Sequence, residues 1–250
     1  MAFRELRRRL NAYWANTWFD SEHLEKMLLD RGLAATQPYV QGLLLDVGCG
    51  QRRHEHLFLP HVTRYIGMDY PPVSEGVWAT TGGEKVDIWA DGHNVPVASA
   101  CVDTVLCSQV LEHVQEPAQV MRELARVLKP GGHAIVTVPQ EWGVHQEPFD
   151  YYRFTRYGLA YLAEKAGLEV VDLRARGGFW AMMGQRWSAY LYDTTCRRLR
   201  RRGNRVAFLL FAIPILPLSA LSQLIGLGLD RVQFLDRNTL GYVLVARKPE

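Results

Sequence analysis

The chain has 250 residues, of which 48% are hydrophobic and 22% charged, and its formal net charge at pH 7 is +3. This composition is that of an ordinary globular protein, so it argues against a disordered chain and against a membrane protein with several spans. The small net charge gives no indication of nucleic-acid binding. A chain of this length commonly forms one open α/β domain, so we expect one domain over residues 1–250 with decorations.

The beginning of the chain is basic, but neither an apolar core nor a small-residue cleavage site follows, so no secretory signal is expected. Residues 3–33 mix arginine, leucine, glutamate and aromatic residues without strand alternation, which predicts one or two helices within an N-terminal helical cap over residues 1–40. The cysteines have no paired metal-ligand spacing, and they are Cys49, Cys101, Cys107 and Cys196. We therefore expect reduced thiols and a cytoplasmic protein.

From Leu43 onward, short apolar runs alternate with longer helical or loop segments, which is typical of a parallel sheet with crossover helices. The predicted strands cover residues 43–47, 64–68, 85–90, 104–107, 133–138, 168–175 and 239–246. One helix is predicted to begin near Pro117 and to end before the Pro-Gly-Gly sequence at 130–132. A second is predicted to begin at Thr155 as the cap and to stop at Gly167.

The first predicted strand ends in Asp46-x-Gly48-x-Gly50, where the glycines permit a tight turn and let a ligand approach the backbone. Asp69 closes the next strand about 20 residues further on, the placement at which a carboxylate accepts hydrogen bonds from ribose hydroxyls. These two features together predict a nucleotide-type ligand at the carboxyl ends of the strands.

A dinucleotide is one such ligand, but Arg53 replaces the third glycine of the G-x-G-x-x-G fingerprint. Asp46 is a second objection, because a carboxylate beside the turn would repel a pyrophosphate and would attract an ammonium group. S-adenosylmethionine carries an ammonium group and no phosphate, so the pattern favours it.

Five stretches in order carry a wider resemblance. They are 45–50 (Leu-Asp-Val-Gly-Cys-Gly), 65–69 (Tyr-Ile-Gly-Met-Asp), 91–96 with Asp-Gly and Val-Pro, 102–114 ending in Val-Leu-Glu-His-Val, and 128–132 (Leu-Lys-Pro-Gly-Gly). The chain thereby resembles the small-molecule class I S-adenosylmethionine-dependent methyltransferases of the type 11 group. The resemblance covers residues 43–178 and resumes at the last strand.

The resemblance implies a Rossmann-like, doubly wound α/β fold with a mostly parallel seven-stranded sheet whose last strand is antiparallel. It also implies an enzyme that transfers a methyl group from S-adenosylmethionine to a small-molecule or lipid-linked acceptor, leaving S-adenosylhomocysteine. A cofactor-binding, membrane-associated accessory module without turnover is the alternative.

The same resemblance assigns Asp46 to the amino group of the cofactor, the glycine turn to its methionine part, Asp69 to the ribose and Asp91 to the adenine. The implied cofactor residues are Asp46, Gly48, Cys49, Gly50, Asp69, Tyr70, Asp91, Gly92, Ser108 and Gln109. The residues after Gly50 depart from the family pattern. We interpret Arg52 and Arg53 there as solvated surface arginines rather than as donors to the cofactor carboxylate.

Methyl transfer to a hydroxyl is helped by a general base, and candidates follow the fourth and fifth predicted strands. They are His113, His145, Glu147 and Asp150, while Tyr152 and Arg153 are candidates to orient an acceptor. No metal site is expected, because neither the Glu112-His113 pair nor the His54-x-His56 pair forms a convincing ligand set in the sequence.

An insertion over residues 179–235 separates the last two predicted strands and divides the core into residues 41–178 and 236–250. Residues 206–229 carry no charge, Pro214 and Pro217 are expected to interrupt them, and six arginines precede them: Arg197, Arg198, Arg200, Arg201, Arg202 and Arg205. We expect a re-entrant or in-plane membrane contact through residues 197–229 at the inner membrane face. A lid and a homodimer interface remain alternatives.

Overall fold

The computed structural model describes residues 17–71 and 85–250. The chain divides into two compact units. The sheet unit contains the described residues among 30–175 and 241–250, and the hairpin unit contains residues 17–29 and 176–240. The N-terminal part of the predicted helical cap lies outside the described residues, and helix α2 (His23–Ala34) follows it.

The sheet unit is built on a seven-stranded sheet, in the order β3-β2-β1-β4-β5-β7-β6. Its strands are β1 (Leu43–Val47), β2 (Arg64–Asp69), β3 (Ile88–Trp89), β4 (Val102–Ser108), β5 (Leu128–Pro139), β6 (Glu169–Ala175) and β7 (Gly241–Arg247). Pairing is parallel from β3 through β5, and β7 runs antiparallel to both of its neighbours. The predicted Rossmann-like fold with an antiparallel last strand is confirmed.

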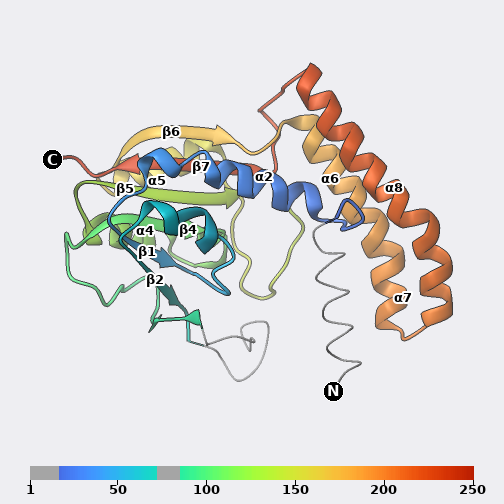
Figure 1. Cartoon of the computed structure of the whole chain (residues 1–250), viewed down its shortest axis with the longest axis horizontal. Coiled ribbons are helices and arrows are strands. Elements are labelled where there is room, and N and C mark those ends of the chain that lie inside the picture. The colour runs from blue at the N-terminus through green and yellow to red at the C-terminus, as the bar shows by residue number, and fades with distance from the viewer. Residues whose placement is uncertain (1–16, 72–84) are drawn as a thin grey trace. The chain divides into compact units, whose positions relative to one another are not determined.

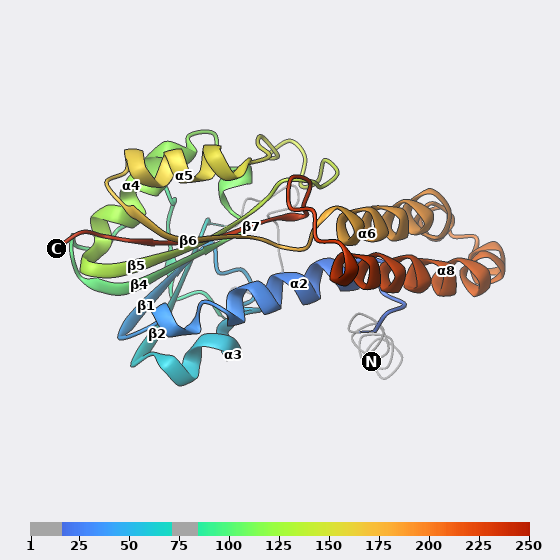
Figure 2. The ribbon, with the colours of Figure 1, turned by 90° about the horizontal axis from the view of Figure 1, so that it is seen from above.

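Helices cover both faces of this sheet (Figure 2). Helices α4 (Pro117–Val127) and α5 (Arg156–Lys165) lie on one face, and α3 (Glu55–Phe58) lies on the other. Short 3-10 turns complete the unit, and they are η1 (Gln37–Tyr39), η2 (Leu59–His61) and η4 (Leu111–His113). Topologically this is a doubly wound sheet, so the carboxyl ends of β1, β2, β4 and β5 meet at one edge.

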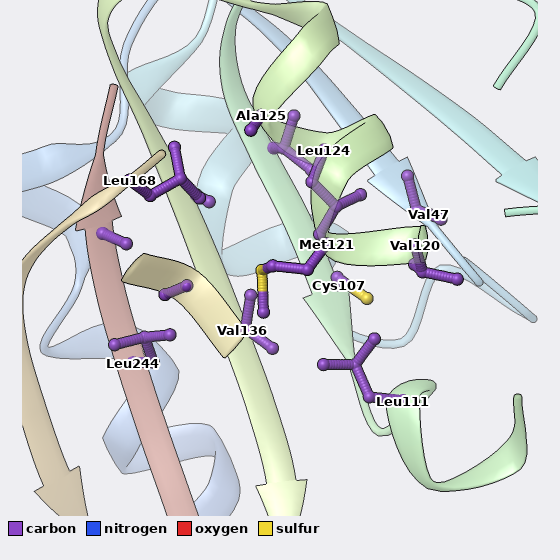
Figure 3. Packing of buried hydrophobic residues seen from close by; sticks show 14 of the residues in the cluster. Val47, Cys107, Leu111, Val120, Met121, Leu124, Ala125, Val136, Leu168 and Leu244 are labelled. Atoms are coloured by element: carbon purple, nitrogen blue, oxygen red, sulfur yellow. The ribbon is translucent and has the colours of Figure 1, made fainter. Parts of the chain in front are cut away.

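The main core lies between the sheet and α4, as Figure 3 shows. Val120, Met121 and Leu124 recur at helical spacing in α4, are fully buried, and pack with strand residues such as Val136. The helix predicted to end before the Pro-Gly-Gly sequence at 130–132 ends at Val127, and Leu128 begins β5. The helix cap predicted at Thr155 is confirmed, because the Thr155 hydroxyl accepts a 3.1 Å hydrogen bond from the Gly158 amide at the start of α5.

The hairpin unit pairs α6 (Phe179–Leu191) with α8 (Arg205–Val232), joined by a π-helical turn (Tyr192–Arg197) and α7 (Arg198–Arg201) (Figure 1). The prediction that Pro214 and Pro217 interrupt the apolar segment is wrong, because α8 continues through both prolines. Both lie on the exposed side of α8, while the residues that pack within the unit, such as Ala212, Ile215 and Ser219, flank them. This packing outweighs the two missing amide donors.

Small and polar residues form the contact between α6 and α8. A Cβ atom on Gly184 would lie 2.4 Å from the Ser222 carbonyl oxygen, and one on Gly226 would lie 2.5 Å from the Trp180 carbonyl oxygen. The Ser222 hydroxyl donates to the Gly184 carbonyl at 3.1 Å. The two helix backbones therefore approach so closely that only glycine fits at these two positions.

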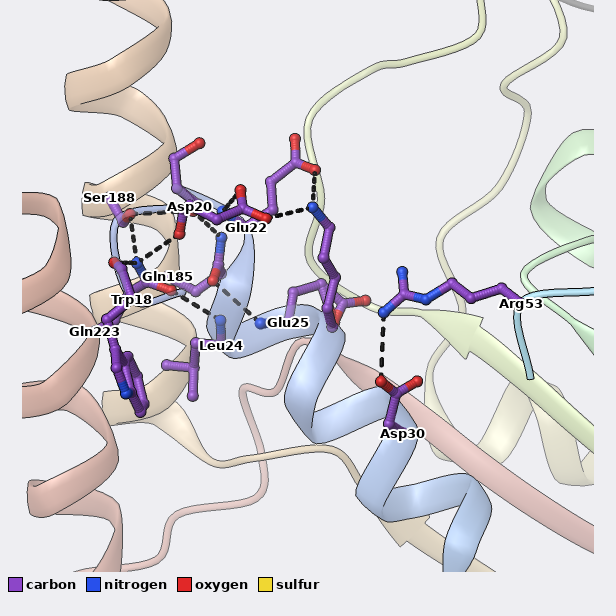
Figure 4. A network of polar contacts seen from close by, with 12 residues as sticks. Trp18, Asp20, Glu22, Leu24, Glu25, Asp30, Arg53, Gln185, Ser188 and Gln223 are labelled. Carbon is purple, nitrogen blue, oxygen red and sulfur yellow. Dashed lines mark hydrogen bonds and ion pairs between the residues drawn. The ribbon is translucent and has the colours of Figure 1, made fainter. Parts of the chain in front are cut away.

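Two glutamines of the hairpin cap the beginning of α2 (Figure 4). The Leu24 amide donates to Gln223 Oε1 at 2.8 Å, and the Glu25 amide donates to Gln185 Oε1 at 3.2 Å. Both glutamine side chains are fully buried, and the Gln185 amide group also donates to the Ser21 carbonyl at 2.7 Å. These contacts satisfy amide groups that the first turn of a helix otherwise leaves without an acceptor.

The outer surface of α8 is exposed and carries large apolar side chains. Within the segment Val206–Val232 of α8, an 18-residue window has a mean hydropathy of 2.1, and only 28% of that window is buried. Among the described residues, α8 is the one helix long and apolar enough to cross a membrane. Large exposed apolar side chains on α8 include Val206, Leu209, Leu210, Ile213, Leu218, Leu221 and Ile225. The hairpin thus buries polar groups among small apolar residues inside and exposes large apolar side chains outside.

The core packing makes a direct prediction about stability. Replacing the fully buried Leu124 by alanine removes apolar contacts and leaves a cavity, so we expect Leu124→Ala to lower the free energy of unfolding by about 2–5 kcal/mol. The exposed Arg122→Ala variant, on the same helix, is the control and should change it by about 0.5 kcal/mol or less. Urea unfolding followed by circular dichroism measures both values, and equal losses would contradict the assigned core face of α4.

Candidate active site at the carboxyl edge of the sheet

A tight turn follows β1 and is held against the end of β2. The amides of Gly48 and Cys49 both donate to the Met68 carbonyl, at 2.8 and 3.0 Å. Gly48 and Gly50 have positive φ angles of 79° and 50°, which favour glycine. A Cβ atom on Gly48 would clash with Val110, whereas one on Gly50 would meet nothing within 4 Å. The backbone at Gly50 is therefore open to a ligand.

Asp69 links this turn to the end of β2. Its Oδ2 accepts a 2.6 Å hydrogen bond from the Gly50 amide, and its Oδ1 accepts a 2.7 Å bond from the amide of the exposed Tyr70. A carboxylate oxygen can accept two hydrogen bonds, so each oxygen keeps capacity for a further donor. Asp69 is thus positioned both to shape the turn and to accept hydroxyl groups from a ligand.

Asp46 lies beneath the turn and is buried, with 4% of its surface exposed. The Tyr65 hydroxyl donates to Asp46 Oδ2 at 2.5 Å. Burial, together with the nearby negative charge of Asp69, raises the pKa of Asp46 to about 7, although the Tyr65 hydrogen bond opposes the shift. A cation at the turn would favour the ionised form of this carboxyl group.

Sequence reasoning did not identify Tyr65, although its position gives a signal. It lies on the strand that pairs with β1 in parallel, and a buried tyrosine hydroxyl needs a polar partner. Asp46, which bonds this hydroxyl, is a buried polar residue of the adjacent strand.

The interpretation of Arg52 as a solvated arginine is wrong. Its side chain is only 13% exposed and pairs with Asp87 and, at 3.1 Å, with Glu55. Its guanidinium group also lies over the Tyr65 ring, 5.5 Å from the centroid. These acidic and aromatic neighbours hold Arg52 against β2, whereas Arg53 is 47% exposed and lies 3.4 Å from Asp30 (Figure 4).

The other predicted cofactor residues lie at the end of β4 and on the loops that follow β3 and β4. Asp91 Oδ1 accepts hydrogen bonds from the backbone amide and the ring of His93, at 2.8 and 2.6 Å. A Cβ atom on the following Gly92 would lie 3.6 Å from Val47, an ordinary van der Waals contact. Ser108 Oγ lies 2.8 Å from Thr137 Oγ1, to which the Gln109 amide group also donates at 3.1 Å. Thr137 of β5 therefore orients the end of β4, a role that sequence reasoning missed.

Burial raises the pKa of Cys49 to about 12, with further contributions from Asp46 and Asp69. This cysteine remains a thiol at neutral pH, so its place in the turn is structural rather than nucleophilic. The four cysteines are all unpaired, in agreement with the expectation of free thiols.

Two predicted catalytic residues meet at the same edge of the sheet. The rings of His113, on η4 after β4, and His145, in the loop after β5, lie 4.8 Å apart in an edge-to-face arrangement. Burial lowers the pKa of His113, although its hydrogen bond to the Phe149 carbonyl opposes the shift. His113 is therefore favoured in the neutral form.

Asp150 and Arg153 form a bidentate pair beneath His145. Arg153 donates to the two Asp150 carboxylate oxygens at 2.7 and 2.8 Å, and the His145 amide donates to Asp150 Oδ2 at 2.9 Å. The Arg153 hydrogen bonds hold the pKa of Asp150 well below its usual range. This arrangement suits Asp150 to orienting its neighbours rather than to accepting a proton. The hydroxyl group of Tyr152, which is exposed, donates a hydrogen bond to the Gln115 carbonyl at 2.8 Å.

Comparison with known proteins agrees with this geometry. A family model described as a methyltransferase domain matches residues 45–136. A protein of Mycolicibacterium smegmatis named as a probable S-adenosylmethionine-dependent methyltransferase is 32% identical over 136 residues, which are 52% of each chain. A Mycobacterium ulcerans protein named only as a methyltransferase is 36% identical over 114 residues, 44% of this chain and 45% of that one. The chain spans about half the length of the curated relatives it matches.

Solved structures share the fold at low sequence identity. The [4+2]-cyclase SpnF aligns with a TM-score of 0.55 at 24% sequence identity. The alignment covers 88% of this chain and 80% of the SpnF chain. The Burkholderia thailandensis 1,6-didemethyltoxoflavin-N1-methyltransferase, solved with S-adenosylhomocysteine, aligns with a TM-score of 0.52 at 17% sequence identity. This alignment covers 99% of this chain and 90% of that methyltransferase. With the strand order and the glycine turn, the family match identifies residues 45–136 as a class I methyltransferase domain of the type 11 group.

Proposed function

We propose that the chain binds S-adenosylmethionine at the carboxyl edge of the sheet and catalyses methyl transfer to a small-molecule or lipid-linked acceptor. The observation that carries this proposal is the turn after β1, where an open backbone at Gly50 lies beside the carboxylate of Asp69 and above the buried Asp46. The relative from Mycolicibacterium smegmatis, by its name, supports the same cofactor.

The residues at this edge fit the cofactor in chemical type. Asp46 supplies a negative charge for an ammonium group, the Gly50 backbone leaves room for the amino-acid part, and Asp69 has acceptor capacity for ribose hydroxyls. Asp91, Gly92, Ser108 and Gln109 are the proposed neighbours of the adenine and sulfonium parts, with Cys49 and Tyr70 beside the turn. When bound, S-adenosylmethionine supplies an electrophilic methyl group.

The residues around the methyl acceptor mainly need to hold its nucleophilic atom in line with the methyl group. Holding two reactants in this geometry accounts for much of the rate acceleration. His145 and His113 are the proposed groups for handling the acceptor proton, because their rings meet after β4 and β5. Asp150 and Arg153 are proposed to hold the His145 loop in place. Tyr152, which is exposed, is proposed to contact the acceptor.

An accessory module that binds the cofactor without turnover is the second candidate. It remains a candidate because a fold does not by itself determine a function. Incubating the chain with methyl-labelled cofactor and an extract of metabolites and lipids distinguishes the two. A labelled product found by mass spectrometry supports the enzyme, whereas cofactor binding with no labelled product in any fraction supports the module.

Removing Asp69 tests the cofactor site. Because hydrogen bonds to a charged group contribute about 1.5–3 kcal/mol, we expect Asp69→Ala to weaken S-adenosylmethionine binding about 10- to 100-fold in calorimetry. Asp172→Ala, which removes an acidic side chain from β6, is the matched control and should bind like the intact chain. Absence of binding by the intact chain would reject the proposal.

The raised pKa of Asp46 predicts that cofactor affinity depends on pH. Above about pH 7 the carboxyl group is ionised and attracts the ammonium group, and below it the carboxyl is protonated in the free protein. Binding then requires release of that proton, so affinity should fall by about 10-fold per pH unit below pH 7. Calorimetry between pH 5.5 and 8 measures this slope. Asp46→Asn should be weaker at pH 8 and should lose the slope, and an unchanged slope would assign it to another group.

We further propose that the hairpin unit contacts a membrane surface through α8. A large apolar surface exposed to water is unfavourable for a soluble protein. In lipid, helices usually contact each other through small and polar residues and expose apolar side chains. Gln185, Ser188 and Gln223 are fully buried, whereas Leu210 and Ile213 are 65% and 74% exposed. Large exposed apolar side chains beside buried polar ones support lipid rather than water as the environment of the outer face of α8.

The arginines favour an in-plane orientation over a span. The six arginines of residues 197–205 flank the turn at the end of the hairpin, so inserting this end would carry all of them into the bilayer. A helix in the interface plane, about 42 Å long for 28 residues, keeps them beside anionic headgroups. A peripheral location at the inner membrane face follows, and the lid and dimer roles stay alternatives.

Charge placed on the apolar face tests the membrane proposal. We expect the Ile213→Glu, Leu221→Glu double variant to bind vesicles of phosphatidylglycerol and phosphatidylcholine at least about 10-fold more weakly than the intact chain, because two exposed apolar contacts are lost. Tyr157→Glu, at an 80% exposed position on α5, is the control and should bind normally.

Cosedimentation measures vesicle binding, and light scattering of the same samples without lipid measures the oligomeric state. Equal vesicle binding by the double variant would contradict the proposed contact. A stable dimer that the two substitutions convert to a monomer, with no vesicle binding by the intact chain, would assign the apolar face to a homodimer instead.

A further inference from the structure

Three metal-ligating side chains converge beside the candidate active site. Glu112 and His113 lie on η4, and His145 lies in the loop that follows β5. One ligand atom from each lies within 4.8 Å of the other two. Neighbouring parallel strands β4 and β5 bring these segments together, although 32 positions separate His113 from His145 in the sequence. We propose that this cluster is a binding site for a divalent transition-metal cation.

Both histidines present the ring nitrogen that a metal needs. His113 Nδ1 lies 2.7 Å from the Phe149 carbonyl oxygen, and His145 Nδ1 lies 3.1 Å from the Gly143 carbonyl oxygen. A carbonyl oxygen only accepts, so each Nδ1 carries the proton in the neutral ring. Each Nε2 therefore carries a lone pair, and that of His113 lies 3.9 Å from Glu112 Oε1.

The surrounding contacts resemble the outer contacts of known metal sites. Ligating histidines usually donate their second ring nitrogen to a backbone carbonyl or a carboxylate, which fixes the ring. His113 meets this condition through Phe149, and His145 meets it through Gly143 with Asp150 Oδ2 at 3.3 Å. The rings are thus already oriented by hydrogen bonds, and Nε2 of His113 lies near Glu112.

Charge and spacing also suit a divalent cation. Glu112 and Asp150 contribute two carboxylates and Arg153 one positive charge. The Arg153 guanidinium group donates to Asp150 and to three backbone carbonyls, and it also interacts electrostatically with Glu112. Metal–ligand bonds of about 2.0–2.2 Å separate ligand atoms by about 3–3.5 Å, so side-chain shifts of about 1 Å would complete the set. Glu112 is 1% exposed and His145 is 31% exposed, so the cluster opens to solvent on one side.

Two imidazoles and one carboxylate form the ligand set of catalytic zinc and of non-haem iron(II) sites, which leave positions open for oxygen ligands. Such a cation would occupy the lone pairs that a general base requires. If the site binds metal, His145 and His113 are ligands, and an acceptor oxygen would be activated by the cation rather than by an imidazole. The proposal is independent of cofactor binding.

Cobalt(II) tests the site directly in the tag-free full chain after dialysis against chelator. We expect one bound cobalt(II) per chain, detected by its visible absorption, and a dissociation constant at least about 10-fold higher for His145→Ala. His56→Ala is the matched control, because His56 belongs to the other histidine pair and is exposed, and it should bind cobalt(II) normally. No cofactor or acceptor is present, so the result does not depend on methyl transfer.

A thermal measurement guards against misfolded variants. Zinc(II) should raise the melting temperature of the intact chain and of His56→Ala, but not that of His145→Ala, whose circular dichroism should match the intact chain. Glu112→Gln, which keeps the side-chain shape, should weaken cobalt(II) binding in the same direction. No cobalt(II) binding by the intact chain below about 1 mM, or equal binding by His145→Ala, would overturn the proposal.

Discussion

The pairing of the β1 turn with the end of β2 is the constraint on which the candidate cofactor site depends. Two consecutive amides, of Gly48 and Cys49, donate to one carbonyl, that of Met68, and Asp69 accepts the amide of Gly50. These bonds exist because β1 and β2 are parallel neighbours in register, which brings both carboxyl ends to one edge. The open backbone at Gly50 and the carboxylates around it follow from this pairing.

The same parallel arrangement brings the second cluster to that edge. β4 and β5 end side by side, and their following segments carry His113 and His145. Asp150 and Arg153 then fix the second loop through a bidentate pair and backbone carbonyls. Cofactor chemistry is thus proposed at the ends of β1 and β2, and acceptor or metal chemistry at the ends of β4 and β5.

The hairpin unit follows a different physical rule. Its two long helices contact each other through glycines, serines and glutamines, and α8 presents leucine, isoleucine and valine outward. Such a contact adds close backbone packing and hydrogen bonds to the apolar burial of residues such as Ala212 and Ile215. That distribution supports the proposed membrane contact of α8.

Much of the sheet unit was predictable from the sequence, because its signals are local. Seven apolar runs, the Asp46-x-Gly48-x-Gly50 turn, the cap at Thr155 and the insertion over residues 179–235 each depend on neighbouring residues. The continuity of α8 through Pro214 and Pro217 was not predictable, because packing within the hairpin offsets the missing hydrogen bonds.

Side-chain partners separated in the sequence required the tertiary structure. The sequence by itself determined the fold class and the identity of the acidic glycine turn, since strand periodicity and spacing encode both. Only the tertiary structure decided that Tyr65 bonds Asp46, that Asp87 and Glu55 hold Arg52, and that His145 joins Glu112 and His113. The physical reason is that strand pairing, which depends on the whole sheet, sets which distant side chains meet.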